Sequence, residues 1–279
     1  MLPVAVEVSS PNRTDSFAFE LIRHLDLTAQ LAGAVLVGSL EAAEKLSGDA
    51  PLDLQGSLRL DGGERLQWNQ IFSGPGALLA TARAAATPLR VLNQTDVADA
   101  RVDSLRLVVA LQEQIQTASV DRIRVLDAEL RPGQEFRLEV VLQPFRGARQ
   151  LLRLKSQIPK ILPSGQVLLR VGGGQASNQW ERDRRPDLLS PRNLSQLLHE
   201  LGSQERNDHL VVELYRAAPS LSINGRELPG APPSMRGVLE RANASGYVSP
   251  VNGRVLFRKR QLTGYVLQGE QQIELEVVQ

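Results

Sequence analysis

The sequence predicts an α+β fold in which strands outnumber helices. Apolar and polar residues alternate along many short segments, which is the period of a strand with one buried face. Segments with helical spacing are fewer, and turn residues separate the elements. The 279 residues are 42% hydrophobic. The chain can therefore bury a substantial core, in one large domain or in two to three small ones.

Residues 1–98 are predicted to form a mixed α/β region that opens directly with a strand. Segments 4–8 and 17–22 alternate like strands, and Pro11-Asn12 between them is typical of a turn. A helix is expected from Asp26 to near Gly48. Its predicted inward stripe consists of Leu27, Leu31, Val35, Gly38 and Ala42.

The same region contains a second pair of strands and a second helix. Asp61-Gly62-Gly63 separates two alternating segments, which predicts a hairpin. An alanine-rich helix is expected to start at Pro75 and to stop before Thr87-Pro88.

Residues 99–175 are strand-dominated and predict an immunoglobulin-like β-sandwich. Within it, "LRPGQEFRLEVVLQPFRG" at 130–147 predicts a turn at Arg131-Pro132-Gly133 followed by a hairpin. Arg137 and Glu139 are expected to face water. The residues expected to face the core are Phe136, Leu138, Val140 and Leu142.

Residues 176–279 predict a strand-rich segment that contains a helix. A polar, arginine-rich loop is expected from 175 to 189, and Ser190-Pro191 then begins a short helix that stops at Gly202. Strands interrupted by a proline-rich link at 229–233 complete the chain. The helix residues expected to point inward are Leu194, Leu197, Leu198 and Leu201.

The composition limits the classes of function. Formal net charge is +1, so no global field favours nucleic acid or an anionic membrane. The sequence has no cysteine, which excludes disulfides, thiolate metal sites and cysteine nucleophiles. No signal peptide is visible, and the apolar run at 31–40 is much shorter than the roughly 20 residues of a membrane helix. No cofactor or metal is expected.

Potential reactive groups have simpler structural interpretations. Gly172-Gly173-Gly174 follows a strand as a phosphate-binding turn does, but no Walker lysine-serine pair follows, which favours a flexible connector. Ser73 lacks the G-x-S-x-G elbow of a nucleophile and is interpreted as a helix cap. The scattered histidines His24, His199 and His209 are interpreted as structural.

The arginine-rich loop is the candidate partner-binding site. Glu181 and Asp183 lie among arginines, which indicates a solvated, ion-paired loop rather than a catalytic carboxylate pair. Tryptophan and arginine are enriched at binding hot spots, so a protein partner is a second interpretation of this loop. The basic run Arg258-Lys259-Arg260 is interpreted as a solvated hairpin end. The residues proposed to contact a partner are Trp180, Arg182, Arg184 and Arg185.

Five segments of the sequence, taken in order, resemble a region found in a known protein family. They are "LPVAVEV", "FAFELIRHLDLTAQL", "LRPGQEFRLEVVLQPFRG", Ile158-Pro159 and "PSGQVLLRVGGG". With them the chain resembles the region that follows the catalytic domain in bacterial SpoIVB-type serine peptidase-like proteins. In that family the preceding domain carries a G-M-S-G-S-P-like serine motif and an upstream histidine. Neither occurs here, so no catalytic residue is carried over.

The resemblance implies a non-catalytic accessory region of a periplasmic, envelope or secreted protein, which supports a catalytic domain or binds a protein partner. It also implies that Met1 is an internal methionine, preceded in the natural protein by a peptidase-like domain and a signal peptide. Two alternatives stay open. One is a free-standing envelope adhesion or assembly module, and the other is a serine hydrolase that uses Ser73 or another serine with one of the histidines.

Overall fold

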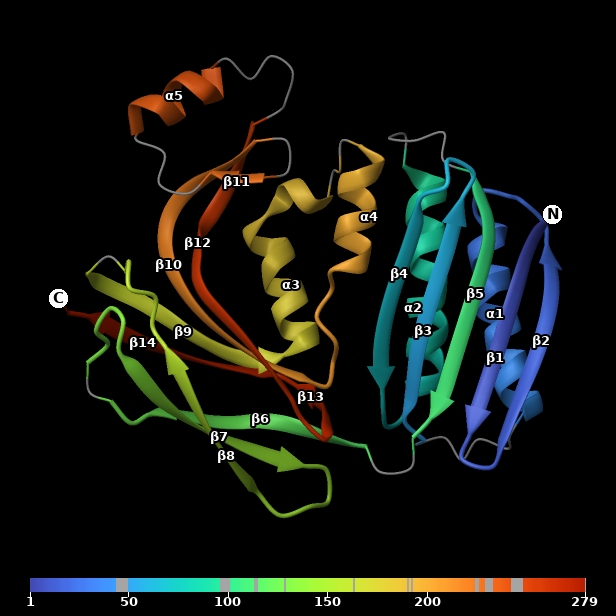
Figure 1. Cartoon of the computed structure of the whole chain (residues 1–279), viewed down its shortest axis with the longest axis horizontal. Coiled ribbons are helices and arrows are strands. Elements are labelled where there is room, and N and C mark those ends of the chain that lie inside the picture. Colours follow the sequence, from blue (N-terminus) through green and yellow to red (C-terminus); the bar gives the residue numbers. More distant parts are fainter. Residues whose placement is uncertain are drawn as a thin grey trace. The chain divides into compact units, whose positions relative to one another are not determined.

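The chain folds into two compact units (Figure 1). The computed structural model describes residues 1–43, 50–95, 101–112, 115–127, 129–162, 164–189, 191, 193–223, 226–228, 233–241 and 248–278. The first unit consists of Met1–Gln116 and Asn193–Arg206, and the second of Thr117–Arg192 and Asn207–Gln279. These boundaries differ from the predicted regions 1–98, 99–175 and 176–279. The α+β, strand-rich fold class is confirmed.

The first unit is built on one sheet with the strand order β2-β1-β5-β3-β4. β1 runs parallel to β5, and the other neighbouring strands are antiparallel. The predicted opening strands and the hairpin around Asp61-Gly62-Gly63 are confirmed. The strands are β1 (Leu2–Ser10), β2 (Arg13–Leu21), β3 (Leu52–Leu60), β4 (Arg65–Phe72) and β5 (Val102–Leu111).

Two helices, α1 (Leu27–Ala43) and α2 (Ala77–Gln94), pack on one face of this sheet (Figure 1). The predicted inward stripe of α1 is wrong, because Leu27 and Leu31 are 44% and 36% exposed. A Cβ at Gly33 would lie 3.5 Å from the carbonyl oxygen of Ala82, so this side of α1 packs against α2. The expected end near Gly48 lies outside the described residues. The buried residues of α1 are Thr28, Ala29, Ala32, Leu36, Ser39, Leu40 and Ala43.

The second helix differs from its prediction at both ends. It begins at Ala77 with Gly76 as the N-cap, so Ser73 is not its cap. It also continues through Pro88. A proline inside a helix removes the backbone hydrogen bond to the carbonyl four residues earlier, here that of Ala84, but Pro88 and Leu89 are buried. Burial of the last two turns outweighs the local cost.

The first unit is completed by α4 (Leu194–Gly202), which returns from a distant part of the sequence. The predicted cap at Ser190-Pro191 is wrong, because Asn193 caps the helix and its side chain accepts a hydrogen bond from the Gln196 N–H at 2.8 Å. The inward leucines are confirmed: Leu197 is buried, and Leu194, Leu198 and Leu201 pack against the same core.

The second unit contains two sheets whose apolar side chains form a single core. One sheet has the order β13-β6-β7-β8. The other has the order β11-β10-β9-β14, with β12 also paired to β10. The strands are β6 (Gln116–Val125), β7 (Glu135–Pro144), β8 (Gln150–Gln157), β9 (Gly165–Gly173), β10 (His209–Ile223), β11 (Arg226–Leu228), β12 (Val248–Leu262), β13 (Tyr265–Gln268) and β14 (Glu270–Val277).

The strands expected to form the sandwich at 99–175 are distributed over three sheets. β5 belongs to the first unit, β6, β7 and β8 pair with one another, and β9 pairs with β10 and β14. The immunoglobulin-like topology stays a prediction.

The β7–β8 hairpin agrees with its prediction. Phe136, Leu138, Val140 and Leu142 are at most 3% exposed. Ahead of it, the Gln134 N–H donates to the Arg131 carbonyl at 3.1 Å, and Gly133 has φ 78°. Proline followed by a glycine with positive φ is the chemistry of a type II turn, which explains the residues that precede the strand.

The helices described in the second unit are α3 (Gly174–Arg184), the 3₁₀ helix η1 (Pro186–Leu189) and α5 (Pro233–Arg241). The arginine-rich stretch is therefore helical, and its prediction as a loop is wrong. Gly172 and Gly173 are also not a connector, since they end β9. A Cβ at Gly173 would lie 2.4 Å from the Leu267 carbonyl oxygen, so this contact requires glycine. Among the described residues, no helix combines the length and apolar composition of a membrane-crossing segment.

Candidate functional site

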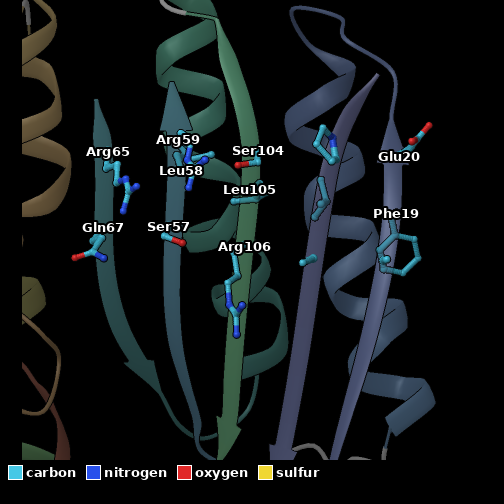
Figure 2. Close-up of a pocket in the computed structure, with 14 residues that line it drawn as sticks. Phe19, Glu20, Ser57, Leu58, Arg59, Arg65, Gln67, Ser104, Leu105 and Arg106 are labelled. Carbon is cyan, nitrogen blue, oxygen red and sulfur yellow. The ribbon is translucent and has the colours of Figure 1, made fainter. Parts of the chain in front are cut away.

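Within the described residues of the first unit, no helix covers the face of the sheet opposite α1 and α2 (Figure 1). We call it the open face. A hollow of about 560 Å³ lies on it, and Figure 2 shows the side chains around it. The hollow is lined by Pro3, Val4, Ala5, Ala18, Phe19, Glu20, Ser57, Leu58, Arg59, Arg65, Gln67, Ser104, Leu105 and Arg106.

Strand register arranges the open-face side chains in rows. In one row Arg65 of β4 lies opposite Arg59 of β3, which lies opposite Ser104 of β5. In the next row Gln67, Ser57 and Arg106 lie opposite one another in the same strand order, and Arg106 also lies opposite Ala5 of β1. Arginines, hydroxyls and one amide thus occupy the β4–β3–β5 side.

Small side chains occupy the other side of the hollow. Ala5 lies opposite Ala18, and Pro3 lies opposite Glu20 on β2. Since neighbouring strands are about 4.8 Å apart, Glu20 on one edge strand is roughly 19 Å from Arg65 on the other. The Glu20 carboxylate is therefore too distant to neutralise Arg59 or Arg65.

Of the arginines Arg59, Arg65 and Arg106 beside the hollow, Arg106 has a carboxylate partner. Arg106 forms an exposed ion pair with Glu7 at 2.9 Å. Arg59 and Arg65 are exposed, and within the described part of the chain no carboxylate forms an ion pair with either of them. Like charges directly opposite on adjacent strands are destabilising. The hollow therefore presents two adjacent guanidinium groups at a cost to the fold.

The predicted partner-binding residues lie in and after α3, where most have internal partners. Arg184 is 4% exposed and forms ion pairs with Glu181 at 2.7 Å and with Glu227 at 2.9 Å. Arg185 pairs with Asp187 at 2.8 Å. Arg182 donates to Gln179 at 3.0 Å on the outer side of the helix. The buried guanidinium of Arg184 is thus bound within the unit by Glu181 and Glu227.

Trp180 is held between charged and aromatic neighbours. The guanidinium carbon of Arg170 lies 4.0 Å from its ring centroid, and Tyr215 makes an edge contact at 5.0 Å between centroids. Such cation–π and edge-to-face contacts stabilise a half-buried tryptophan. Trp180 therefore anchors α3 to the sheet.

Several charged residues around Trp180 form a connected network. Arg258 pairs with Glu181 at 3.0 Å and with Glu213 at 2.6 Å. Burial raises the pKa of Glu213 and lowers the pKa of Arg170, because both lose water. The run Arg258-Lys259-Arg260 lies near the end of β12, where Arg260 is exposed and Arg258 pairs internally. The network ties α3, β10 and β12 together.

The candidate catalytic groups are not brought together by any contact in the described part of the chain. Ser73 Oγ donates to the Ile115 carbonyl at 3.4 Å. His24 lies ahead of α1, His199 is in α4 and His209 begins β10. Within the described residues, no group of three or more histidine or acidic side chains has the arrangement of a metal site.

Comparisons with known proteins found no matching family model, no matching curated protein and no matching solved structure.

The open-face arginines were missed at the sequence level. The signal was present, since Leu58-Arg59-Leu60 and Leu105-Arg106-Leu107 repeat an outward arginine between inward leucines. Their convergence depends on β5 inserting between β1 and β3, which alternation alone does not reveal.

Proposed function

We propose that this chain is a non-catalytic, partner-binding region that recognises an acidic segment of another protein on the open face. The observation that carries the proposal is the cross-strand pair Arg59–Arg65, two exposed guanidinium groups directly opposite each other beside a hollow. A bound carboxylate would relieve their repulsion. Arginine is suited to this role because its planar fork donates two parallel hydrogen bonds to a carboxylate.

The rest of the hollow fits a peptide ligand. The Ser57 and Ser104 hydroxyls and the Gln67 amide can pair with peptide groups, while Ala5 and Ala18 leave room for backbone. Proteins that bind single-stranded nucleic acid use exposed aromatic platforms. The one aromatic residue among those lining this hollow, Phe19, packs against the core of the unit. These features favour an acidic peptide over nucleic acid.

The proposal agrees with the resemblance to the region that follows the catalytic domain of SpoIVB-type serine peptidase-like proteins. A catalytic domain of that kind is one candidate partner. The periplasmic, envelope or secreted location belongs to the same proposal.

A binding assay with a labelled octaglutamate peptide tests the proposed function. Fluorescence anisotropy would compare the wild-type chain with the double variant Arg59→Gln/Arg65→Gln. Loss of two exposed ion pairs of up to about 1 kcal/mol each should weaken binding by about 5- to 30-fold. Raising the salt concentration should weaken wild-type binding as well.

Arg83→Gln provides the matched control, because Arg83 is an exposed arginine on α2, away from the open face. It removes one positive charge, as each substitution of the double variant does, and should bind the peptide like wild type. Equal weakening in the control and the double variant would contradict a specific site. Tighter binding of a single-stranded oligonucleotide that also depends on Arg59 and Arg65 would contradict the choice of a protein partner.

A further inference from the structure

Among the described residues β2 pairs with β1 alone, so its other edge can accept another strand. It is the terminal strand of its sheet, and its nine residues pair with β1 in continuous register without a bulge. It contains no proline, lysine or glycine. Natural edge strands are usually protected by such residues, by bulges or by short length. Its charged residues, Arg13, Asp15 and Glu20, lie on either side of Ser16–Phe19 and leave that central stretch without any of these protections.

Hairpin geometry identifies the backbone groups that point outward. Ser10 pairs with Arg13 across the two-residue turn Pro11-Asn12, so this closing pair exchanges its backbone hydrogen bonds. Pairs then alternate along an antiparallel ladder. The backbone N–H and C=O groups of the odd-numbered residues of β2 therefore bond to β1. The N–H and C=O groups pointing away from β1 belong to Thr14, Ser16, Ala18 and Glu20.

An apolar ledge accompanies this edge on the helix side. Phe17 and Phe19 are half-buried against the core. On α1, Gly33 faces α2, and at 100° per residue Leu31 and Val35 lie on the opposite side of the helix. Since α1 packs on β1 and β2, that side is directed toward the β2 edge. Leu31 does not contribute to the core, and its exposed side chain extends the apolar surface beside β2.

The edge is also self-complementary. The central residues Ser16-Phe17-Ala18-Phe19 carry no charge, so two copies can meet there without repulsion. An antiparallel pairing centred on Ala18 sets Phe17 opposite Phe19 of the second copy, and cross-strand aromatic pairs stabilise such ladders. Closed two-fold dimers are the commonest protein assemblies.

We propose that β2 pairs antiparallel with β2 of a second copy of this chain, with Ala18 on the two-fold axis. The two sheets become one continuous sheet, and both open faces lie on the same side of it. Two arginine hollows would then face the same partner. The dimer itself does not depend on the proposed function, since Arg59 and Arg65 are on β3 and β4.

Sedimentation equilibrium of the full chain over a wide range of concentration tests the proposal. Wild type should form a reversible dimer. Ala18→Pro should raise its dissociation constant at least about tenfold, because the N–H that proline removes points outward and bonds only to the second copy. Ala18→Val keeps that N–H and should dimerise like wild type. A wild type that stays monomeric at every concentration would overturn the proposal.

A charge-pairing experiment does not depend on the proline variant folding. Ala18→Lys and Ala18→Glu each place like charges opposite each other on the axis, so each alone should dimerise more weakly than wild type, by about 1.5- to 5-fold. An equimolar mixture should recover association through Lys–Glu pairs. If each charged variant dimerises as well as wild type, or if mixing restores nothing, β2 is not the interface. Arg59→Gln/Arg65→Gln should dimerise normally, which separates this outcome from failure of the peptide site.

Discussion

Gly56 of β3 shows how closely side chains are fitted in the first unit. It lies opposite Trp68 of β4, and a Cβ at Gly56 would lie 2.2 Å from carbons of the indole ring. The ring covers the glycine and packs against the core of this unit. No other residue type leaves room for the indole at this position.

Gly56→Ala should lower the free energy of unfolding by about 1 to 3 kcal/mol, since the rigid indole must move to admit the methyl group. Urea denaturation measures the change. Gly38→Ala is the control, because Gly38 is an exposed position of α1 and a methyl group there would meet no neighbouring atom within 4 Å. It should stabilise the chain by about 0.5 to 1 kcal/mol through helix propensity. A neutral Gly56→Ala would show that Trp68 does not pack there.

Leu138 tests the register of the β7–β8 hairpin. Its side chain is 1% exposed in the core between the two sheets of the second unit. Leu138→Ala should destabilise the chain by about 2 to 5 kcal/mol, which denaturant unfolding can measure. Leu151→Ala on the outer side of β8, where Leu151 is 48% exposed, should stay within about 0.5 kcal/mol of wild type. The reverse order of effects would mean that the hairpin faces the other way.

At the scale of elements, α3 depends on charges rather than on apolar burial. Its sequence is mostly polar, and its contacts to the sheet run through Trp180, Arg184 and Glu181. Burial raises the pKa of Glu181, but the hydrogen bond from Arg184 and the charges of Arg184 and Arg258 outweigh it. The net pKa is below the usual value of 4.5.

The attachment of α3 should therefore weaken in acid. A carboxylate with a folded-state pKa below its unfolded value adds stability above the unfolded value, and loses it as pH falls through the folded value. Unfolding free energies measured between about pH 7 and pH 3 should fall less steeply for Glu181→Gln than for wild type. Asp183→Asn, which removes an exposed carboxylate bonded to the Gln179 amide, should follow wild type. Identical slopes for Glu181→Gln and wild type would contradict this role.

Helices were harder to predict than strands, for reasons that lie in particular residues. Alternation identified the β7–β8 hairpin and its inward residues, because one wet face leaves a clear period. α1 is apolar almost all round, so its periodicity could not decide which stripe is buried. Packing against α2 and against the sheet decides it. α2 continues through Pro88 because tertiary burial overrides a local cost. α3 has few apolar residues, and the ring contacts of Trp180 together with its ion pairs hold it against the sheet.

At the scale of the whole molecule, the chain crosses between its two units more than once. The segment 193–206 belongs to the first unit although β6, β9 and α3 of the second precede it. This return, like the insertion of β5 between β1 and β3, rests on long-range contacts that have no local signal. The sequence therefore shows that these arginines point outward from their strands, but not that the strands bring them together.

The return segment should contribute to the stability of the first unit. A fragment of residues 1–116 lacks α4 and uncovers the core that Leu197 contacts. The same fragment joined by a flexible linker to residues 191–206 should unfold with a free energy about 2 to 4 kcal/mol higher, from the leucines that α4 buries. Calorimetry and urea unfolding would compare the two. Equal stability would show that α4 is not part of this unit.

The central claim is that the open face binds an acidic protein segment through its arginines. The most direct measurement is NMR of the arginine Nε–Hε groups during titration with the octaglutamate peptide. The signals of Arg59, Arg65 and Arg106 should shift and saturate together, while those of Arg83 and Arg90 on α2 stay unchanged. Shifts spread evenly over arginines of both units, or none at Arg59 and Arg65, would contradict the account.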